Sequence, residues 1–242
     1  QARKLATDVR HWLCLGDRPG CELLRVLEEK CGVKVFHRGF EPSGVAASMN
    51  NGAVGLAVLL NSNNRRWRRN YDLAHELFHI LVWDIFRSTS QGDSETADEL
   101  EEKLATCFAA NLLMPAEAVQ DAIERHGILT YRSLFDIARE FDVSVDALLW
   151  RLHYLDKLTL GQTQRAIERA GRLRSELETR QRDDSEAPKY PERYRALAVK
   201  ALSRGEMSVG RFAEYLGTSR REAMKYVERE ADDFEEVQLD TA

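Results

Sequence analysis

The sequence predicts an α+β protein that is predominantly helical and carries a small three-stranded sheet. Segments with strand character are confined to residues 33–61, and apolar residues recur at helical spacing almost continuously from residue 70 onward. The chain has 242 residues, of which 43% are hydrophobic and 31% charged, an ordinary composition for a folded protein. This length allows one large domain, or a medium domain with a small appendage.

The N-terminal part predicts two helices followed by a strand. The helices are expected at residues 4–15 and 19–31, because Asp17 and Pro19 are typical before and at a helix start and Gly32 is typical of a helix end. The next residues, 33–38 (VKVFHR), alternate between apolar and polar side chains, as a half-buried strand does.

A β-hairpin is expected next. Residues 45–49 (VAASM) and 54–61 (VGLAVLLN) favour strands, and they flank the turn-forming residues Asn50, Asn51 and Gly52. An Asn-Gly step between two such segments is a strong hairpin signal.

The helical part begins with residues 71–86, whose apolar positions include Leu73, Leu77, Ile80 and Leu81. A second helix is expected at 97–114, where a buried stripe is predicted at Leu100, Leu104, Phe108 and Leu112. Pro115 ends that helix and opens the next one, at 116–126.

Residues 131–155 have the spacing of a helix–turn–helix, with Ser144 as the expected N-cap of the second helix. Acidic residues in and after its second helix argue against DNA binding there, so we expect this segment to pack on the core. A long polar helix follows, and residues 183–191 predict a linker because they combine charges with two prolines. We therefore expect a domain at 1–157, a helix and linker at 158–190, and a small helical region at 191–242.

Charge is unevenly distributed along the chain. The net charge is −5, and residues 228–242 alone hold seven acidic residues and one arginine. Residues 65–69 (RRWRR) gather four arginines around one tryptophan, a pattern of a solvated surface or of a site for single-stranded nucleic acid. No apolar run is long enough to span a membrane, and four irregularly spaced cysteines indicate reduced thiols, so we expect a cytoplasmic protein.

The residues that indicate chemistry are His75, Glu76 and His79. Two histidines four apart on a helix lie one turn above the other and can bind one metal ion. Glu76 lies beside them, close enough to take a proton from a water molecule at the metal. The alternative is that two histidines lie on an otherwise apolar helix and that the glutamate beside them is there by chance.

A hydrolytic zinc site needs a third protein ligand and leaves its fourth position open. The acidic residues at the start of the next helix are all candidates: Glu95, Asp98, Glu99, Glu101 and Glu102. Glu101 lies one heptad before Phe108, and Glu102 lies close to the same stripe, so helical periodicity leaves these two as rivals.

Residues 69–79 (RNYDLAHELFH) and 101–115 (EEKLATCFAANLLMP) together resemble the ImmA/IrrE family of bacterial zinc metallopeptidases. The resemblance covers about residues 1–155 and implies a zincin-like peptidase core. Aligning the FAANLLMP segment puts the third ligand, after His75 and His79, at Glu102. Phe78 stands where the family usually has Gly, and Thr106 where it often has Asn.

The resemblance also implies a function. Family members cleave helix–turn–helix repressors and thereby switch on DNA-damage responses, mobile elements, toxin–antitoxin loci or anti-phage operons. We therefore expect a Zn²⁺-dependent endopeptidase with Glu76 as general base, a repressor as substrate, and activating single-stranded nucleic acid as a further partner. A non-catalytic, antitoxin-like binding module that keeps a zinc is the alternative, although such a site would not need Glu76.

Two questions stay open at the level of sequence. Several side chains are candidates for stabilising the oxyanion: Tyr71, His126, Tyr131 and His153. A cysteine thiolate could also occupy the fourth zinc position and block the enzyme. The four candidates for that role are Cys14, Cys21, Cys31 and Cys107.

Overall fold

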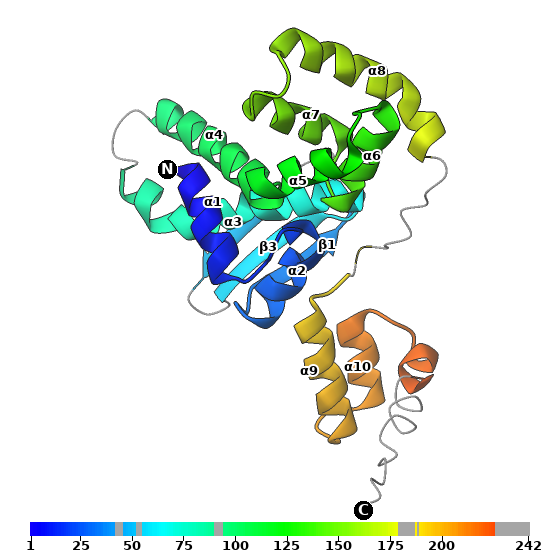
Figure 1. The fold of residues 1–242 in the computed structure, drawn as a ribbon. Coiled ribbons are helices and arrows are strands. Elements are labelled where there is room, and N and C mark those ends of the chain that lie inside the picture. The colour runs from blue at the N-terminus through cyan, green and yellow to red at the C-terminus, as the bar shows by residue number, and fades with distance from the viewer. Residues whose placement is uncertain (42–45, 52–54, 90–93, 179–186, 188, 226–242) are drawn as a thin grey trace, which may run out of the picture. The chain divides into compact units, whose positions relative to one another are not determined.

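The structure is a computed structural model, and it describes residues 1–41, 46–51, 55–89, 94–178, 187 and 189–225 (Figure 1). Its described part is mostly helical with one three-stranded sheet, so the predicted α+β class is confirmed. The chain divides into two compact units, residues 1–189 and 190–242. The predicted linker lies largely outside the described residues, as does the acidic tail, and the three-part division stays a prediction.

The sheet has the strand order β1-β3-β2. Strands β2 (Ala47–Asn51) and β3 (Gly55–Asn61) pair in antiparallel fashion, which confirms the hairpin. Asn50 and Asn51, expected in the turn, instead belong to β2 and pair with Leu56 and Gly55. Strand β1 (Lys34–Arg38) pairs with β3 in parallel, so β3 is the central strand.

Helices α1 (Ala2–Trp12) and α2 (Pro19–Glu29) precede the sheet, and α2 begins at the predicted proline. Helix α3 (Arg66–Thr89) begins five residues before the expected range of 71–86. The arginine-rich segment forms the first turns of α3, and two ion pairs hold it there. Arg66 pairs with Asp142 at 2.6 Å, and Arg68 pairs with Asp72 one turn later at 2.9 Å.

Helix α4 (Ser94–Leu113) packs against both α3 and α1 (Figure 1). Its second half is the buried half, with Ala105, Phe108, Ala109, Leu112 and Leu113 all fully enclosed. Leu100, predicted to be buried, is 52% exposed. Leu100 fits the helical spacing of the apolar residues that follow it. The buried stripe of α4 nevertheless starts only at Ala105, one turn further on.

Helices α5 (Ala116–His126), α6 (Tyr131–Glu140), α7 (Val145–Tyr154) and α8 (Leu160–Glu178) complete the described part of the first unit. Ser144 caps α7, because its Oγ accepts a hydrogen bond from the Ala147 backbone N–H at 3.1 Å. Ile137 of α6 and Leu148 of α7 are fully buried. The helix–turn–helix-like segment is thus part of the core.

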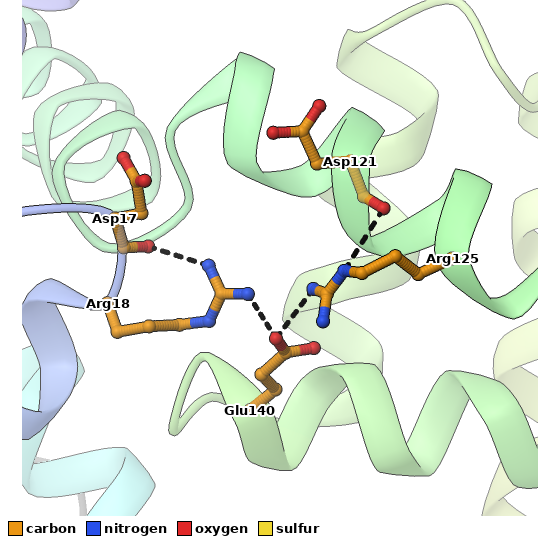
Figure 2. Close-up of polar contacts among 5 residues, drawn as sticks. All are labelled: Asp17, Arg18, Asp121, Arg125 and Glu140. Carbon is orange, nitrogen blue, oxygen red and sulfur yellow. Dashed lines mark hydrogen bonds and ion pairs between the residues drawn. The ribbon is translucent and has the colours of Figure 1, made fainter.

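An ion cluster ties three elements of this unit together (Figure 2). Glu140, at the end of α6, accepts hydrogen bonds from Arg18, which precedes α2, and from Arg125 of α5, the latter at 2.6 Å. Arg125 also donates to the backbone carbonyl of Asp121 at 3.4 Å. Arg18 lies over the Phe141 ring, 4.4 Å from its centroid.

The second unit contains α9 (Glu192–Ser203), α10 (Val209–Leu216) and a further helical stretch at 220–225. Phe212 is its most enclosed large side chain and packs with Ala198, Ala213 and Ala223. Ser219 starts the last stretch, since its Oγ and the Glu222 carboxylate each accept a hydrogen bond from the other residue's backbone N–H. Within the described residues, no helix has both the length and the apolar character needed to cross a membrane.

Candidate metal centre

Helix α3 places His75 and His79 one turn apart on the same face. Their ring centroids are 4.9 Å apart, and each side chain is 17% exposed. The other side of the helix is held by the core, where Leu77 and Phe78 are buried. The amphipathic sequence of α3 therefore fixes which way both imidazoles point.

Helix α4 supplies the third group, Glu102. Its Oε2 lies 3.1 Å from His75 Nε2, and its Oε1 lies 3.3 Å from His79 Nε2. One ligand atom from each of the three residues lies within 4.8 Å of the others, and no further group of this kind occurs among the described residues. The structure thus brings together the three residues that the sequence and the resemblance predict as ligands.

Glu101 and Glu102 approach different nitrogens. The carboxylate of Glu101 lies 2.7 Å from Nδ1 of His79, on the far side of the ring from Glu102, and it is 20% exposed. A carboxylate at this position holds the proton on Nδ1 and leaves Nε2 with a lone pair. The two neighbours therefore contact different nitrogens of the same ring.

The donor set suits a metal ion. Burial lowers the pKa of His75 below its ordinary value, and the opposing charge of Glu102 does not overcome that effect. The imidazole is therefore neutral at neutral pH, which is the form that binds metal. Two imidazole nitrogens and one carboxylate are a set of protein donors found in catalytic zinc sites.

Glu76 lies on α3 between the two histidines in sequence. It is 8% exposed, and it makes no hydrogen bond or ion pair with any part of the chain that the structure describes. One turn earlier, Asp72 is 4% exposed and is held by Arg68 at 2.9 Å and by Asn64 at 3.1 Å. Burial raises the pKa of Asp72 to about 6, and the nearby charge of Glu76 acts in the same direction.

Of the four candidates for oxyanion stabilisation, the structure brings Tyr71 to the centre. Its ring centroid is 6.2 Å from that of His75. His153 has another use, because its Nδ1 hydrogen-bonds to the Leu158 carbonyl at 2.9 Å and closes the turn after α7. His126 is exposed at the end of α5, and Tyr131 lies in the first turn of α6.

None of the four cysteines, all within described parts of the chain, joins the donor group. Cys14 and Cys21 are exposed, while Cys31 and Cys107 are partly buried. Cys107 does line a cavity beside Glu102. An inhibitory thiolate at the metal is therefore not part of this arrangement.

Sequence reasoning missed that cavity, which α1, α4 and α7 enclose next to Glu102. Arg3 and Arg151, neither of which sequence reasoning placed in a cavity, line the wall. The available signal was Arg151 itself, a cation set among the buried Leu148, Leu149 and Leu152 of one helix. Charged residues are almost never fully buried without a partner or a role.

A His-Glu-x-x-His helix beside a helix that supplies a carboxylate is the arrangement that metallopeptidases carry. Residues 28–153, just over half of the chain, match the family described as the IrrE N-terminal-like domain, Peptidase_M78. The chain belongs to this family, as the two motifs predict.

Two curated relatives are both named "Radiation response metalloprotease IrrE". The Deinococcus deserti protein is 39% identical over 99 residues, which are 39% of this chain and 35% of that protein. The Deinococcus radiodurans protein is 34% identical over 99 residues, covering 39% of this chain and 30% of that protein. The similarity thus spans about a third of each relative. A solved structure named "Mycobacterium tuberculosis transcriptional regulator" covers 63% of this chain and 46% of its own, with 18% identity and a TM-score of 0.46.

Proposed function

We propose that this chain is a zinc-dependent endopeptidase whose ligands are His75, His79 and Glu102 and whose general base is Glu76. One observation carries the proposal: three donor atoms lie within 4.8 Å of one another beside a nearly buried carboxylate without a hydrogen-bond partner in the described chain. Structural zinc sites are closed by four protein ligands, whereas a three-residue set leaves a position for water and substrate.

Each residue has a defined part in the chemistry. Zinc in this site would lower the pKa of a water molecule at its open position and polarise a peptide carbonyl. Glu76 accepts the proton of that water as the water attacks the carbonyl carbon, and then returns the proton to the leaving amine. Because no partner in the described chain occupies the Glu76 oxygens, they are available for this transfer. Glu101 holds His79 in the tautomer that presents Nε2.

The proposed substrate is a helix–turn–helix repressor, whose cleavage would switch on a stress, mobile-element or anti-phage operon in the cytoplasm. The family resemblance supports this choice, and the names of the two Deinococcus relatives fit a regulatory protease of a stress response. The gene beside this one is where we expect the repressor to be encoded.

Activation by single-stranded nucleic acid is part of the proposal, but the arginine-rich segment supports it less than its composition suggests. Arg66 and Arg68 form ion pairs with Asp142 and Asp72, and Arg69 donates to the Asn64 carbonyl at 2.7 Å. Arg65 is exposed and Trp67 is half-buried. Oligonucleotides therefore belong in the cleavage assay as an added component, with and without the Arg65→Gln substitution.

The deciding experiment replaces Glu76 by Gln, which is nearly the same size but cannot accept the proton near neutral pH. We expect the variant to keep its fold and one zinc per chain, measured by native mass spectrometry, and to lose cleavage of the neighbouring repressor by about 100- to 10,000-fold. Glu124→Gln, at an exposed position of α5, is the matched control and should cleave normally. Equal cleavage by wild type and Glu76→Gln would favour the non-catalytic binding module instead.

A further inference from the structure

A cavity of about 820 Å³ lies beside the metal centre, and Glu102 borders both. It is enclosed by α1, α4 and α7, and its size is within the range of small-ligand pockets. The lining residues that matter for its chemistry are Arg3, Cys107, Ala110, Asn111, Arg151 and Tyr154. The cavity is therefore placed where part of a substrate would lie while another part occupies the metal centre.

Arg151 is a buried cation in the wall of this cavity. It is 4% exposed, and its Nε donates to the Met114 carbonyl at the end of α4, at 2.9 Å. Within the described chain, its guanidinium makes no other hydrogen bond and no ion pair. Burial lowers the pKa of Arg151 to about 10, so the group remains charged at neutral pH. A buried charge without an ion-pair partner is costly unless something else compensates it.

Arg3 adds a second positive charge to the same cavity. Its side chain is exposed on α1, and it too forms no ion pair with the described residues. After burial, the charge of Arg3 is the next cause that lowers the pKa of Arg151, and the charge of Glu117 acts more weakly in the opposite direction. Two cations that line one cavity repel each other, and an anion between them would remove that repulsion.

The other walls indicate which anion fits. Ala110, Cys107 and the Tyr154 ring offer apolar surface for an aliphatic stem, and the two arginines offer forked donors that match a carboxylate. Lys103 at the border pairs with Glu99 at 3.3 Å and so contributes little free charge. Asp98 and Glu102 also border the cavity, and their charges would repel a phosphate dianion more than a single carboxylate.

We propose that this cavity is a subsite for an acidic side chain of the substrate, an aspartate or glutamate close to the bond that is cut. Arg3 and Arg151 bind its carboxylate, and the apolar walls contact its stem. This inference rests on the proposed peptidase function, because it describes the bound acidic residue as part of a substrate. The carboxylate site itself rests only on the cavity and its two cations.

The binding test uses the full chain carrying Glu76→Gln, loaded with zinc, so that nothing is cleaved. The probe is N-acetyl-glutamate N-methylamide, and the glutamine analogue is its uncharged match, both titrated calorimetrically. We expect the glutamate probe to bind more tightly than the glutamine probe. Arg3→Gln should weaken glutamate binding by about tenfold, the loss expected for one hydrogen bond to a charged group.

Two further variants separate recognition from folding. Lys4→Gln removes an exposed cation from the same helix outside the cavity, and we expect it to leave glutamate binding unchanged. Arg151→Lys keeps the charge but removes the fork and the bond to Met114, so it should weaken binding while circular dichroism reports whether the fold survives. Because Arg3 is exposed, Arg3→Gln tests recognition even if Arg151→Lys does not fold.

Four results would overturn the proposal. The glutamate and glutamine probes could bind equally, or Arg3→Gln could leave glutamate binding unchanged. If binding of the glutamate probe disappears when zinc is chelated but is unchanged by Arg3→Gln, the carboxylate binds the metal. Inorganic phosphate that displaces the glutamate probe and binds more tightly would make this a phosphate site. If the probe behaves as expected while wild type cleaves nothing, the carboxylate site stands and the peptidase proposal fails.

Discussion

Glu101 and Glu102, which are adjacent on α4, reach different atoms of the proposed metal centre. Successive residues on an α-helix differ by about 100° in direction, yet a glutamate side chain is long enough for both to reach the same histidine. Glu102 faces the Nε2 atoms of His75 and His79, whereas Glu101 faces Nδ1 of His79. Each carboxylate therefore has its own measurable effect.

Zinc affinity distinguishes these two effects. We expect Glu102→Ala to lose zinc, because a ligand is removed. Glu101→Ala should keep zinc but bind it about 10- to 100-fold more weakly, the usual cost of losing a group that orients a ligand. Glu101→Gln should recover part of that loss, since an amide oxygen still accepts from Nδ1–H. Competition with a chromophoric chelator measures all three, and a zinc-free Glu101→Ala beside a zinc-loaded Glu102→Ala would reverse the assignment.

Phe78 replaces the glycine that the resembled family usually has, and the structure shows where its ring goes. It is 2% exposed and lies against Phe108 of α4, with ring centroids 5.6 Å apart. It also meets His79 edge-on at 6.0 Å. The residue thus joins the two helices that carry the proposed ligands.

Truncation of Phe78 should be costly for that reason. We expect Phe78→Ala to lower the free energy of unfolding by about 3–5 kcal/mol, as for other fully buried aromatic residues. Urea unfolding monitored by circular dichroism gives the value. Trp12→Ala, at a position that is 71% exposed, is the control and should change stability little. A loss below 1 kcal/mol for Phe78→Ala would mean that the ring is not needed for this packing.

At the scale of elements, local signals predicted most helices and strands but not their ends or partners. Pro19, Pro115 and Ser144 mark helix starts because their chemistry acts within one turn. The early start of α3 depends on Asp142, more than 70 residues away, which pairs with Arg66. The parallel pairing of β1 with β3 likewise rests on contacts that no local pattern contains.

The Glu140 cluster makes a pH-dependent connection between elements. Burial by itself would raise the pKa of Glu140, but the hydrogen bonds from Arg125 and Arg18 outweigh it, so the pKa lies below its ordinary value. A carboxylate with a lowered pKa in the folded state stabilises the fold above the unfolded pKa of about 4.3. That contribution is lost as the pH falls through the folded pKa.

We therefore expect Glu140→Gln to be less stable than wild type at pH 7 and to differ less from it as the pH falls from about 4 downward. The difference at pH 7 should be modest, because the side chain of Glu140 is 27% exposed and its partners are screened by solvent. Thermal unfolding across the pH range measures this, with Glu124→Gln as a control. A difference between the two proteins that does not change with pH would contradict the assignment.

At the scale of the whole molecule, the chain forms two units with separate hydrophobic clusters. Every residue of the proposed metal centre and of the carboxylate cavity belongs to the first unit. The sequence predicted the histidine pair and Glu76 because one helix carries them. It could not predict the cavity, since Arg3 and Arg151 lie on helices that are far apart in the sequence, α1 and α7.

A chain ending at Lys189 should therefore fold and bind one zinc. The reason is that the contacts of the metal centre all lie within the first unit, so the second unit is not needed to form it. Circular dichroism and native mass spectrometry of this shortened chain, beside the full chain, provide the measurement. An insoluble or zinc-free product would show that the second unit contributes to folding of the first.

Because the proposed ligands lie on two helices, zinc would also stabilise the fold. Between His79 on α3 and Glu102 on α4 the chain runs for 23 residues, so one bound ion would act as a crosslink that closes this loop. A ligand that binds only the folded state stabilises it in proportion to the logarithm of its free concentration. The resistance of this chain to cellular proteolysis should accordingly follow the supply of free zinc. Metal starvation would then shorten its lifetime as well as lower the proposed activity.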